Sequence, residues 1–144
     1  MEPGLRFAAI DIGSNAMRLL FSSVIVKENE LPYFIKESLI RMPLRLGHDA
    51  FTTGNISEKN CDSFVNVIMG FKNLIDAYNP LSYRACATAA MRNAANGPEL
   101  VSLVEKTCGI NLNIISGQEE AAMILSKNIN HYIKTKNNYI HIDV

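Results

Sequence analysis

The sequence has no excess of charge of either sign. Its 14 lysine and arginine residues balance 14 aspartate and glutamate residues. The chain therefore lacks the net positive charge with which nucleic-acid-binding domains attract a long polyanion. Any anion-binding site must depend on local groups of residues. Apolar residues never run together over a membrane-spanning length, and the first apolar run, Phe7 to Ile10, is too short for a signal-peptide core. We therefore expect a cytoplasmic protein, with neither a membrane nor a nucleic acid as a partner.

Cysteine and histidine are scarce and scattered. Cys61, Cys86 and Cys108 are far apart and form no C-x-x-C pair, so neither a disulfide framework nor a thiolate zinc site is indicated. The 3 histidines are equally dispersed, and a single histidine is more often a surface or core residue than a ligand. What remains, with 48% hydrophobic and 19% charged residues, is the composition of one ordinary folded domain.

Hydrophobic periodicity predicts strands first and then alternating helices and strands. Strands are expected at residues 7–10, 17–26, 31–45, 82–87 and 111–115, and residues 139–144 are again strand-like. Helices are expected at 57–78 with Ser57 as N-cap, at 98–107 with Gly109 as the C-terminal stop, and from 116 onward. Residues 47–54 and 88–92 are expected to be loops. This order predicts an α/β fold, a ribonuclease-H-like (actin-like ATPase) mixed five-stranded sheet flanked by helices.

The turn between the first two strands is the first candidate site. Its sequence is Asp11-Ile12-Gly13-Ser14-Asn15. Glycine lets an anion approach closely, and successive backbone N–H groups can hold phosphate oxygens. Asp11, at the strand end, could hold a magnesium ion or its water. By composition alone, a plain tight turn fits these residues equally well.

Two neighbouring glutamates form the second candidate site. Ser116 and Glu119 have the spacing of a capping box, which gives Glu119 a structural task. Glu120 is not needed by that cap and is expected to point toward the strand ends, where open α/β sheets bind ligands and a carboxylate could activate water. An ordinary first-turn glutamate, favoured by the helix dipole, is the alternative.

Basic and polar residues near the other strand ends complete the candidates. Arg92 follows the strand at 82–87, and a guanidinium binds phosphate bidentately, with Thr88 adding a hydroxyl. A solvated arginine in a loop is the alternative. Arg18 lies inside an apolar run, where a strand arginine can face a site as readily as a sheet surface. Asp143 ends the last strand-like segment.

These segments together resemble the N-terminal part of the Ppx/GppA family, the exopolyphosphatases and guanosine pentaphosphate phosphohydrolases of the actin-like ATPase superfamily. The resemblance rests on AAIDIGSNAMRLL at Ala8–Leu20, RLG at Arg45–Gly47, ACATAAMRNAAN at Ala85–Asn96 and GINLNIISGQEEA at Gly109–Ala121. These motifs, in this order and at the expected separations, identify the family far more specifically than any single motif would.

The resemblance implies roles for individual residues. It implies phosphate binding by a set of residues in two segments: Asp11, Gly13, Ser14, Asn15, Thr88 and Arg92. It implies that Glu120, rather than Glu119, orients the hydrolytic water. It also implies Mg²⁺ as cofactor, with Asp11 and Asp143 as its candidate ligands. The roles of His48 and Asp49 stay open.

We therefore expect hydrolysis of a terminal phosphoanhydride bond in inorganic polyphosphate or in guanosine pentaphosphate. One alternative is a kinase or ATPase of the same superfamily. Another is a non-catalytic module that senses polyphosphate or guanosine tetra- and pentaphosphate. Paired family members imply a homodimer.

The resemblance also bears on domain organisation. The family continues with a glycine-rich second phosphate loop, whose first aspartate corresponds to Asp143. Residues 1–144 are therefore expected to be the N-terminal subdomain of a Ppx/GppA-like phosphatase, truncated at the start of that loop. By itself this piece is expected to bind substrate weakly and to turn over little or none of it.

Overall fold

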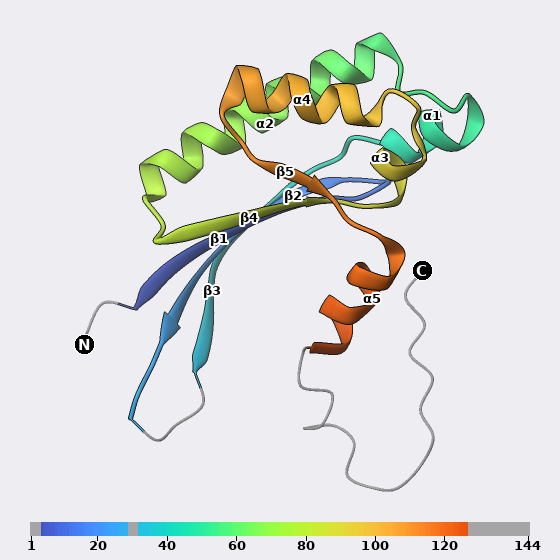
Figure 1. Cartoon of the computed structure of the whole chain (residues 1–144). Helices are drawn as coiled ribbons and strands as arrows, with labels where there is room; N and C mark the ends of the chain where they lie inside the picture. The colour runs from blue at the N-terminus through green and yellow to red at the C-terminus, as the bar shows by residue number, and fades with distance from the viewer. Residues whose placement is uncertain (1–3, 29–31, 127–144) are drawn as a thin grey trace, which may run out of the picture.

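Five strands form one mixed sheet in a computed structural model that describes residues 4–28 and 32–126 (Figure 1). The strands are β1 (Leu5–Ile12), β2 (Met17–Ile25), β3 (Tyr33–Met42), β4 (Ser82–Ala87) and β5 (Leu112–Ile114). Their order across the sheet is β3-β2-β1-β4-β5. The predicted α/β class and the five-stranded sheet are confirmed. The strand-like segment 139–144 lies outside the described residues.

The connections decide which strands run parallel. The hairpins from β1 to β2 and from β2 to β3 give antiparallel pairs. The crossovers through helices give parallel pairs of β1 with β4 and of β4 with β5, because a parallel connection needs a helix or a comparable length of chain. The carboxyl ends of β1, β4 and β5 therefore meet at one edge of the sheet.

The core lies on one face of the sheet, beneath two helices. Figure 1 shows α2 (Glu58–Tyr78) and α4 (Gly97–Cys108) on the same side of the strands. Strand β1 turns every second residue toward them, and α2 contributes residues spaced by three and four. The buried set includes Ala8, Ile10, Ile12, Phe64, Ile68, Phe71, Ile75, Leu100 and Val104. Within the described ranges, no helix combines the length and the apolar character needed to cross a membrane.

Two segments predicted as loops are short helices. Residues 47–54 contain most of α1 (Leu46–Thr52), and residues 88–92 contain most of α3 (Ala89–Asn93). In α1 the buried residues Leu46 and Ala50 are one helical turn apart, but so short a repeat cannot be recognised by periodicity in the sequence. Helix α4, by contrast, ends at Gly109 in the left-handed conformation, as predicted.

The start of α2 is capped by a residue of α1. Ser57 occupies the N-cap position, as predicted, but its side chain makes no capping hydrogen bond. Instead the Asp49 carboxylate accepts hydrogen bonds from the Ser57 backbone N–H, the Ser57 hydroxyl and the Asn60 amide. These bonds, led by that from the Ser57 hydroxyl, lower the pKa of Asp49. A negative charge also suits a helix N-terminus, so Asp49 has a structural role.

Replacing Asp49 by alanine should destabilise the chain by about 1 kcal/mol, the usual cost of losing an N-cap. Asp62→Ala is the matched control, because it removes an exposed carboxylate from the first part of the same helix. Urea unfolding measures both. Since folding lowers the pKa of Asp49 from 3.8, its stabilisation is present above about pH 4 and is lost as the pH falls further. Equal stability of the two variants at neutral pH would contradict this role.

Candidate functional site

The carboxyl ends of three parallel strands define the candidate site. Ile12 pairs with Ala87, and Ala87 pairs with Ile114. Two backbone hydrogen bonds continue the ladder beyond the strand ends, from Thr88 N–H to the Ile12 carbonyl and from Ile115 N–H to the Ala87 carbonyl, each at 3.0 Å. The segments that follow the strands therefore lie along one edge: Gly13–Asn15, Thr88–Arg92 and Ser116–Glu120.

The tip of the β1–β2 hairpin is held from outside by α1. The Gly47 N–H donates a 2.8 Å hydrogen bond to the Ser14 carbonyl. A Cβ on residue 47 would lie 2.6 Å from the Cβ of Ser14, a distance that real Cβ atoms do not tolerate. Glycine at position 47 therefore allows α1 to approach the tip. The Ser14 and Asn15 side chains have no hydrogen-bond partner within the described ranges, so both can accept a ligand.

Asp11 is paired with the arginine directly opposite it on β2. The Asp11 Oδ2 atom lies 2.7 Å from Arg18 Nη1, and the two side chains are 49% and 44% exposed. A pair this exposed adds little stability, but it orients both groups on the face of the sheet away from α2. Arg18 thus lies on the sheet face opposite α2, beside Asp11.

Whether Asp11 can bind a magnesium ion depends on which of its carboxylate oxygens is free of a partner. Its Oδ2 atom accepts from Arg18, whereas its Oδ1 atom has no partner in the part of the chain that the structure describes. Mg²⁺ is commonly held by one or two carboxylates together with substrate phosphates, so Asp11 suits a partial site. No cluster of three or more potential metal-binding residues occurs among the described residues. Asp143 lies outside them.

Arg92 is fixed against the start of α5 (Gly117–Ser126). Its Nη1 atom donates a 2.7 Å hydrogen bond to the Ile115 carbonyl and lies 3.7 Å from Glu120 Oε2. The guanidinium lies against the first turn of α5, since a Cβ on Gly117 would be in ordinary contact with Arg92 Nη2 at 3.9 Å. Arg92 lies in α3 rather than in the loop of the alternative interpretation, and it is an exposed residue even though its guanidinium is bonded to the Ile115 carbonyl. Its remaining N–H groups are available for an anion.

The two glutamates of α5 have separate tasks. The Glu119 N–H donates to Ser116 Oγ at 3.1 Å, and the Ser116 N–H donates to Glu119 Oε2 at 2.8 Å. The predicted capping box is confirmed, and its backbone hydrogen bond is the leading cause of the lowered pKa of Glu119. Glu120 takes no part in the cap and contacts Arg92 instead.

Thr88 is more buried than expected for a residue predicted to bind phosphate. It is only 8% exposed, and its hydroxyl lies 3.4 Å from the Ile12 carbonyl, the atom to which its N–H already donates. Thr88 therefore joins the ends of β1 and β4. A contact between its hydroxyl and a phosphate stays a prediction.

Comparison with known proteins decides the family. The sequence model of the Ppx/GppA phosphatase family matches residues 24–144. The chain belongs to the Ppx/GppA phosphatase family. It is 26% identical over 119 residues to Exopolyphosphatase 1 of Mycobacterium tuberculosis, covering 83% of this chain and 33% of the relative. It is 31% identical over 117 residues to the bifunctional 3-dehydroquinate synthase/phosphatase of Fusobacterium nucleatum, covering 79% of this chain and 18% of the relative.

Solved structures of the family share the fold. The Aquifex aeolicus Ppx/GppA family member superimposes with a TM-score of 0.73 at 28% identity, over 82% of this chain and 37% of that one. An exopolyphosphatase from Cytophaga hutchinsonii gives a TM-score of 0.72 at 25% identity, over 82% of this chain and 36% of that one. The chain therefore spans about a third of the length of these exopolyphosphatases.

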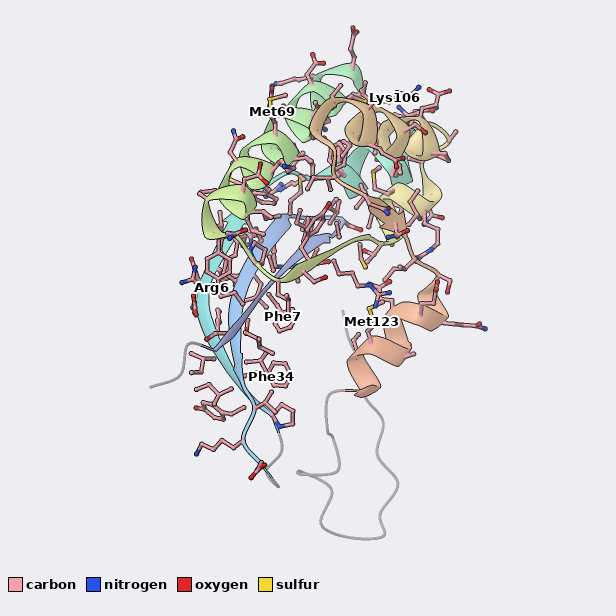
Figure 2. The ribbon with its side chains drawn as sticks, turned by 60° about the vertical axis from the view of Figure 1, so that its left-hand side comes forward. Arg6, Phe7, Phe34, Met69, Lys106 and Met123 are labelled. Atoms are coloured by element: carbon pink, nitrogen blue, oxygen red, sulfur yellow. The ribbon has the colours of Figure 1, made fainter. Side chains whose placement is uncertain are left out.

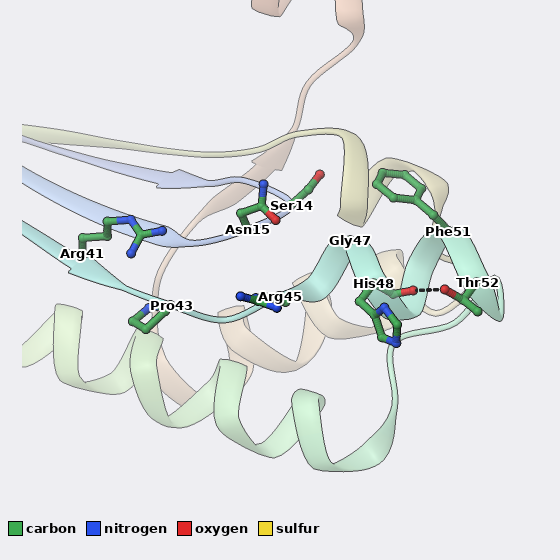
Figure 3. A pocket seen from close by; sticks show the side chains of 9 residues that line it. All are labelled: Ser14, Asn15, Arg41, Pro43, Arg45, Gly47, His48, Phe51 and Thr52. Carbon is green, nitrogen blue, oxygen red and sulfur yellow. Dashed lines mark hydrogen bonds between the residues drawn. The ribbon is translucent and has the colours of Figure 1, made fainter. Parts of the chain in front are cut away.

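One group of residues near the candidate site was missed from the sequence. Arg41, at the end of β3, and Arg45, before α1, line a hollow beside Ser14 and Asn15 (Figure 3). Arg45 is part of the RLG motif, which was a signal for the family but not for a role. Arg41 lies opposite Arg18 in the sheet, and only the strand register reveals that proximity.

Replacing Gly47 by alanine should destabilise the fold by about 1–3 kcal/mol, the cost of forcing a methyl group into a packed contact. Gly70→Ala is the control, because a Cβ there meets nothing within 4 Å and alanine favours the interior of a helix by about 1 kcal/mol. Denaturant unfolding should therefore shift in opposite directions for the two variants. A neutral Gly47→Ala would show that α1 does not hold the hairpin tip.

Proposed function

We propose that the complete protein hydrolyses the terminal phosphoanhydride bond of inorganic polyphosphate or of guanosine pentaphosphate. Membership of a phosphatase family supports a hydrolytic reaction. The observation that carries the proposal is the division between the two glutamates, in which Glu119 caps α5 while Glu120 is left beside Arg92 at the ligand edge of the sheet.

In the proposed mechanism most of the catalysis is positioning and electrostatics, as phosphoryl transfer requires. The backbone N–H groups near Gly13 and Ser14 bind oxygens of the terminal phosphate. The Arg92 guanidinium, already anchored on the Ile115 carbonyl, binds the phosphate with its remaining donors. A phosphate there competes with Glu120 for Arg92, since the 3.7 Å separation of the pair is loose.

Glu120 then orients a water molecule and accepts its proton. The water oxygen forms a bond to the terminal phosphorus, while the bond from that phosphorus to the bridging oxygen breaks. Inorganic phosphate and a chain shorter by one phosphate leave. Mg²⁺, held by Asp11 and in our proposal also by Asp143, would supply positive charge to the phosphates. A homodimer and a cytoplasmic location stay predictions.

Glu120→Gln in the complete protein should lower turnover by about two to four orders of magnitude, the range of a lost general base, and leave substrate affinity largely unchanged. Glu119→Gln is the matched control, because glutamine also serves in a capping box; it should retain turnover. Phosphate release and equilibrium binding of polyphosphate measure the two effects. Full turnover by Glu120→Gln would refute the assignment.

The same measurements separate the alternative functions. Tight binding of polyphosphate or guanosine pentaphosphate without phosphate release would establish a sensor. Consumption of ATP that depends on an acceptor would establish a kinase. We further propose that residues 1–144 are the N-terminal part of the enzyme and that this piece alone releases little phosphate; a rate equal to that of the complete protein would contradict this.

A further inference from the structure

The hollow beside the hairpin tip is lined by neither Arg92 nor Glu120. Its volume is about 750 Å³, within the range of roughly 300–1,000 Å³ for small-molecule sites. Its lining comes from the hairpin tip, the end of β3 and α1. The lining residues are Ser14, Asn15, Arg41, Pro43, Arg45, Gly47, His48, Phe51 and Thr52. Figure 3 shows the Arg41 side chain to the left of Asn15 and the Arg45 side chain below it.

The positive charge of this hollow is not compensated. Arg41 and Arg45 are exposed, and neither guanidinium has a hydrogen-bond or ion-pair partner within residues 4–28 and 32–126. No carboxylate lines the hollow. The Asp49 carboxylate of α1 does not line the hollow and accepts hydrogen bonds from Ser57 and Asn60 instead. Since the chain carries no net charge, the two arginines of the lining are a local excess of positive charge.

The sheet register adds an independent reason for an anion here. Asp11 lies opposite Arg18 on β2, and Arg18 lies opposite Arg41 on β3, so the three side chains form one row across the sheet. Like charges placed directly opposite each other are unfavourable. Asp11 compensates Arg18 at 2.7 Å but leaves Arg41 uncompensated. A bound polyanion would balance it.

Ser14 and Asn15 connect the hollow to the reaction edge, because they belong both to the hairpin tip and to the lining. A chain of phosphates whose end is held at Gly13 and Ser14 can therefore continue toward Arg45 and Arg41. Guanidinium groups bind phosphate oxygens in a bidentate manner. A single phosphate would satisfy one arginine, whereas a chain of linked phosphates can satisfy both.

We propose that Arg41 and Arg45 form a second phosphate subsite, which binds the phosphates of a linear polyphosphate behind the phosphate that is hydrolysed. This inference rests on the proposed function, since it takes the edge with Glu120 as the place of reaction. The subsite adds affinity for long chains and does not take part in the bond-breaking step.

The test compares Arg41→Gln, Arg45→Gln and the double variant of the complete protein, with Lys106→Gln as control. Lys106 is an exposed cation on α4 (Figure 2) that does not line the hollow, and its loss removes the same charge. Each arginine variant should raise KM for long-chain polyphosphate about tenfold, as expected for losing a charge-assisted hydrogen bond. The factor by which KM for tripolyphosphate rises should be at least three times smaller than the factor for long-chain polyphosphate. The value of kcat should change by no more than about twofold. Lys106→Gln should change none of these.

Direct binding separates this proposal from the proposed function. Equilibrium binding of labelled long-chain polyphosphate needs no hydrolysis, so weaker binding by the arginine variants supports the subsite even if the protein releases no phosphate. Unchanged KM and unchanged binding in well-folded variants, checked by circular dichroism and melting temperature, would overturn it.

A guanosine tetraphosphate arm distinguishes the two sources of linked phosphates. Phe51, 61% exposed at the hollow, offers a ring on which a base can stack. If the arginine variants and Phe51→Ala weaken guanosine tetraphosphate binding while long-chain polyphosphate binding is unchanged, the polyphosphate assignment is wrong. Loss of polyphosphate binding in the arginine variants but not in Phe51→Ala supports it.

Discussion

The parallel pairing of β1 with β4 and of β4 with β5 is the constraint on which the site depends. It brings Ile12, Ala87 and Ile114 into one register, so segments about 75 and 30 residues apart in the sequence leave the sheet side by side. The antiparallel hairpin places the turn at the same edge, because β2 begins where β1 ends. Backbone hydrogen bonds between the strands are enough to align these strand ends, and no side-chain contact is required.

The charged groups of the site add orientation more than stability. Their ion pairs are a third to a half exposed, and pairs of this kind contribute about 0–1 kcal/mol. Anchoring comes instead from hydrogen bonds to the backbone: Arg92 to the Ile115 carbonyl and Glu119 to the Ser116 N–H. Because these fixed contacts use only some of the available donors and acceptors, the remaining ones are free to bind a substrate.

The face of the sheet opposite α2 and α4 changes character along its length. Near the site it carries the charged row of Asp11, Arg18 and Arg41. At the far end, Leu5 pairs with Val24 and Val24 with Phe34, and Figure 2 shows Phe7 and Phe34 on this face. Strand alternation explains the pattern, since every second residue of β1–β3 points away from the helices. On this face, charged side chains therefore lie near the carboxyl end of β1, and apolar side chains lie near its amino end.

The sequence by itself determined the strands and helices whose hydrophobic pattern extends over enough residues to show its period. The buried residues of β1 alternate at Ala8, Ile10 and Ile12, and those of α2 recur every three or four residues from Phe64 to Ile75. Each pattern therefore fits only one type of secondary structure. The capping box of Ser116 and Glu119 was equally readable, because a helix N-terminus is a local structure whose partners are three residues apart.

Tertiary structure decided the rest, because the deciding partners are distant in the chain. Helices α1 and α3 are one or two turns long and acquire their place by packing on the hairpin tip and the strand ends. The Ser57 hydroxyl bonds the Asp49 carboxylate because α1 brings that stronger acceptor within reach. Arg41 stands opposite Arg18 because of a register that includes a shift between Phe21 and Ser22. Strand register depends on contacts between segments, and no local pattern of residues encodes it.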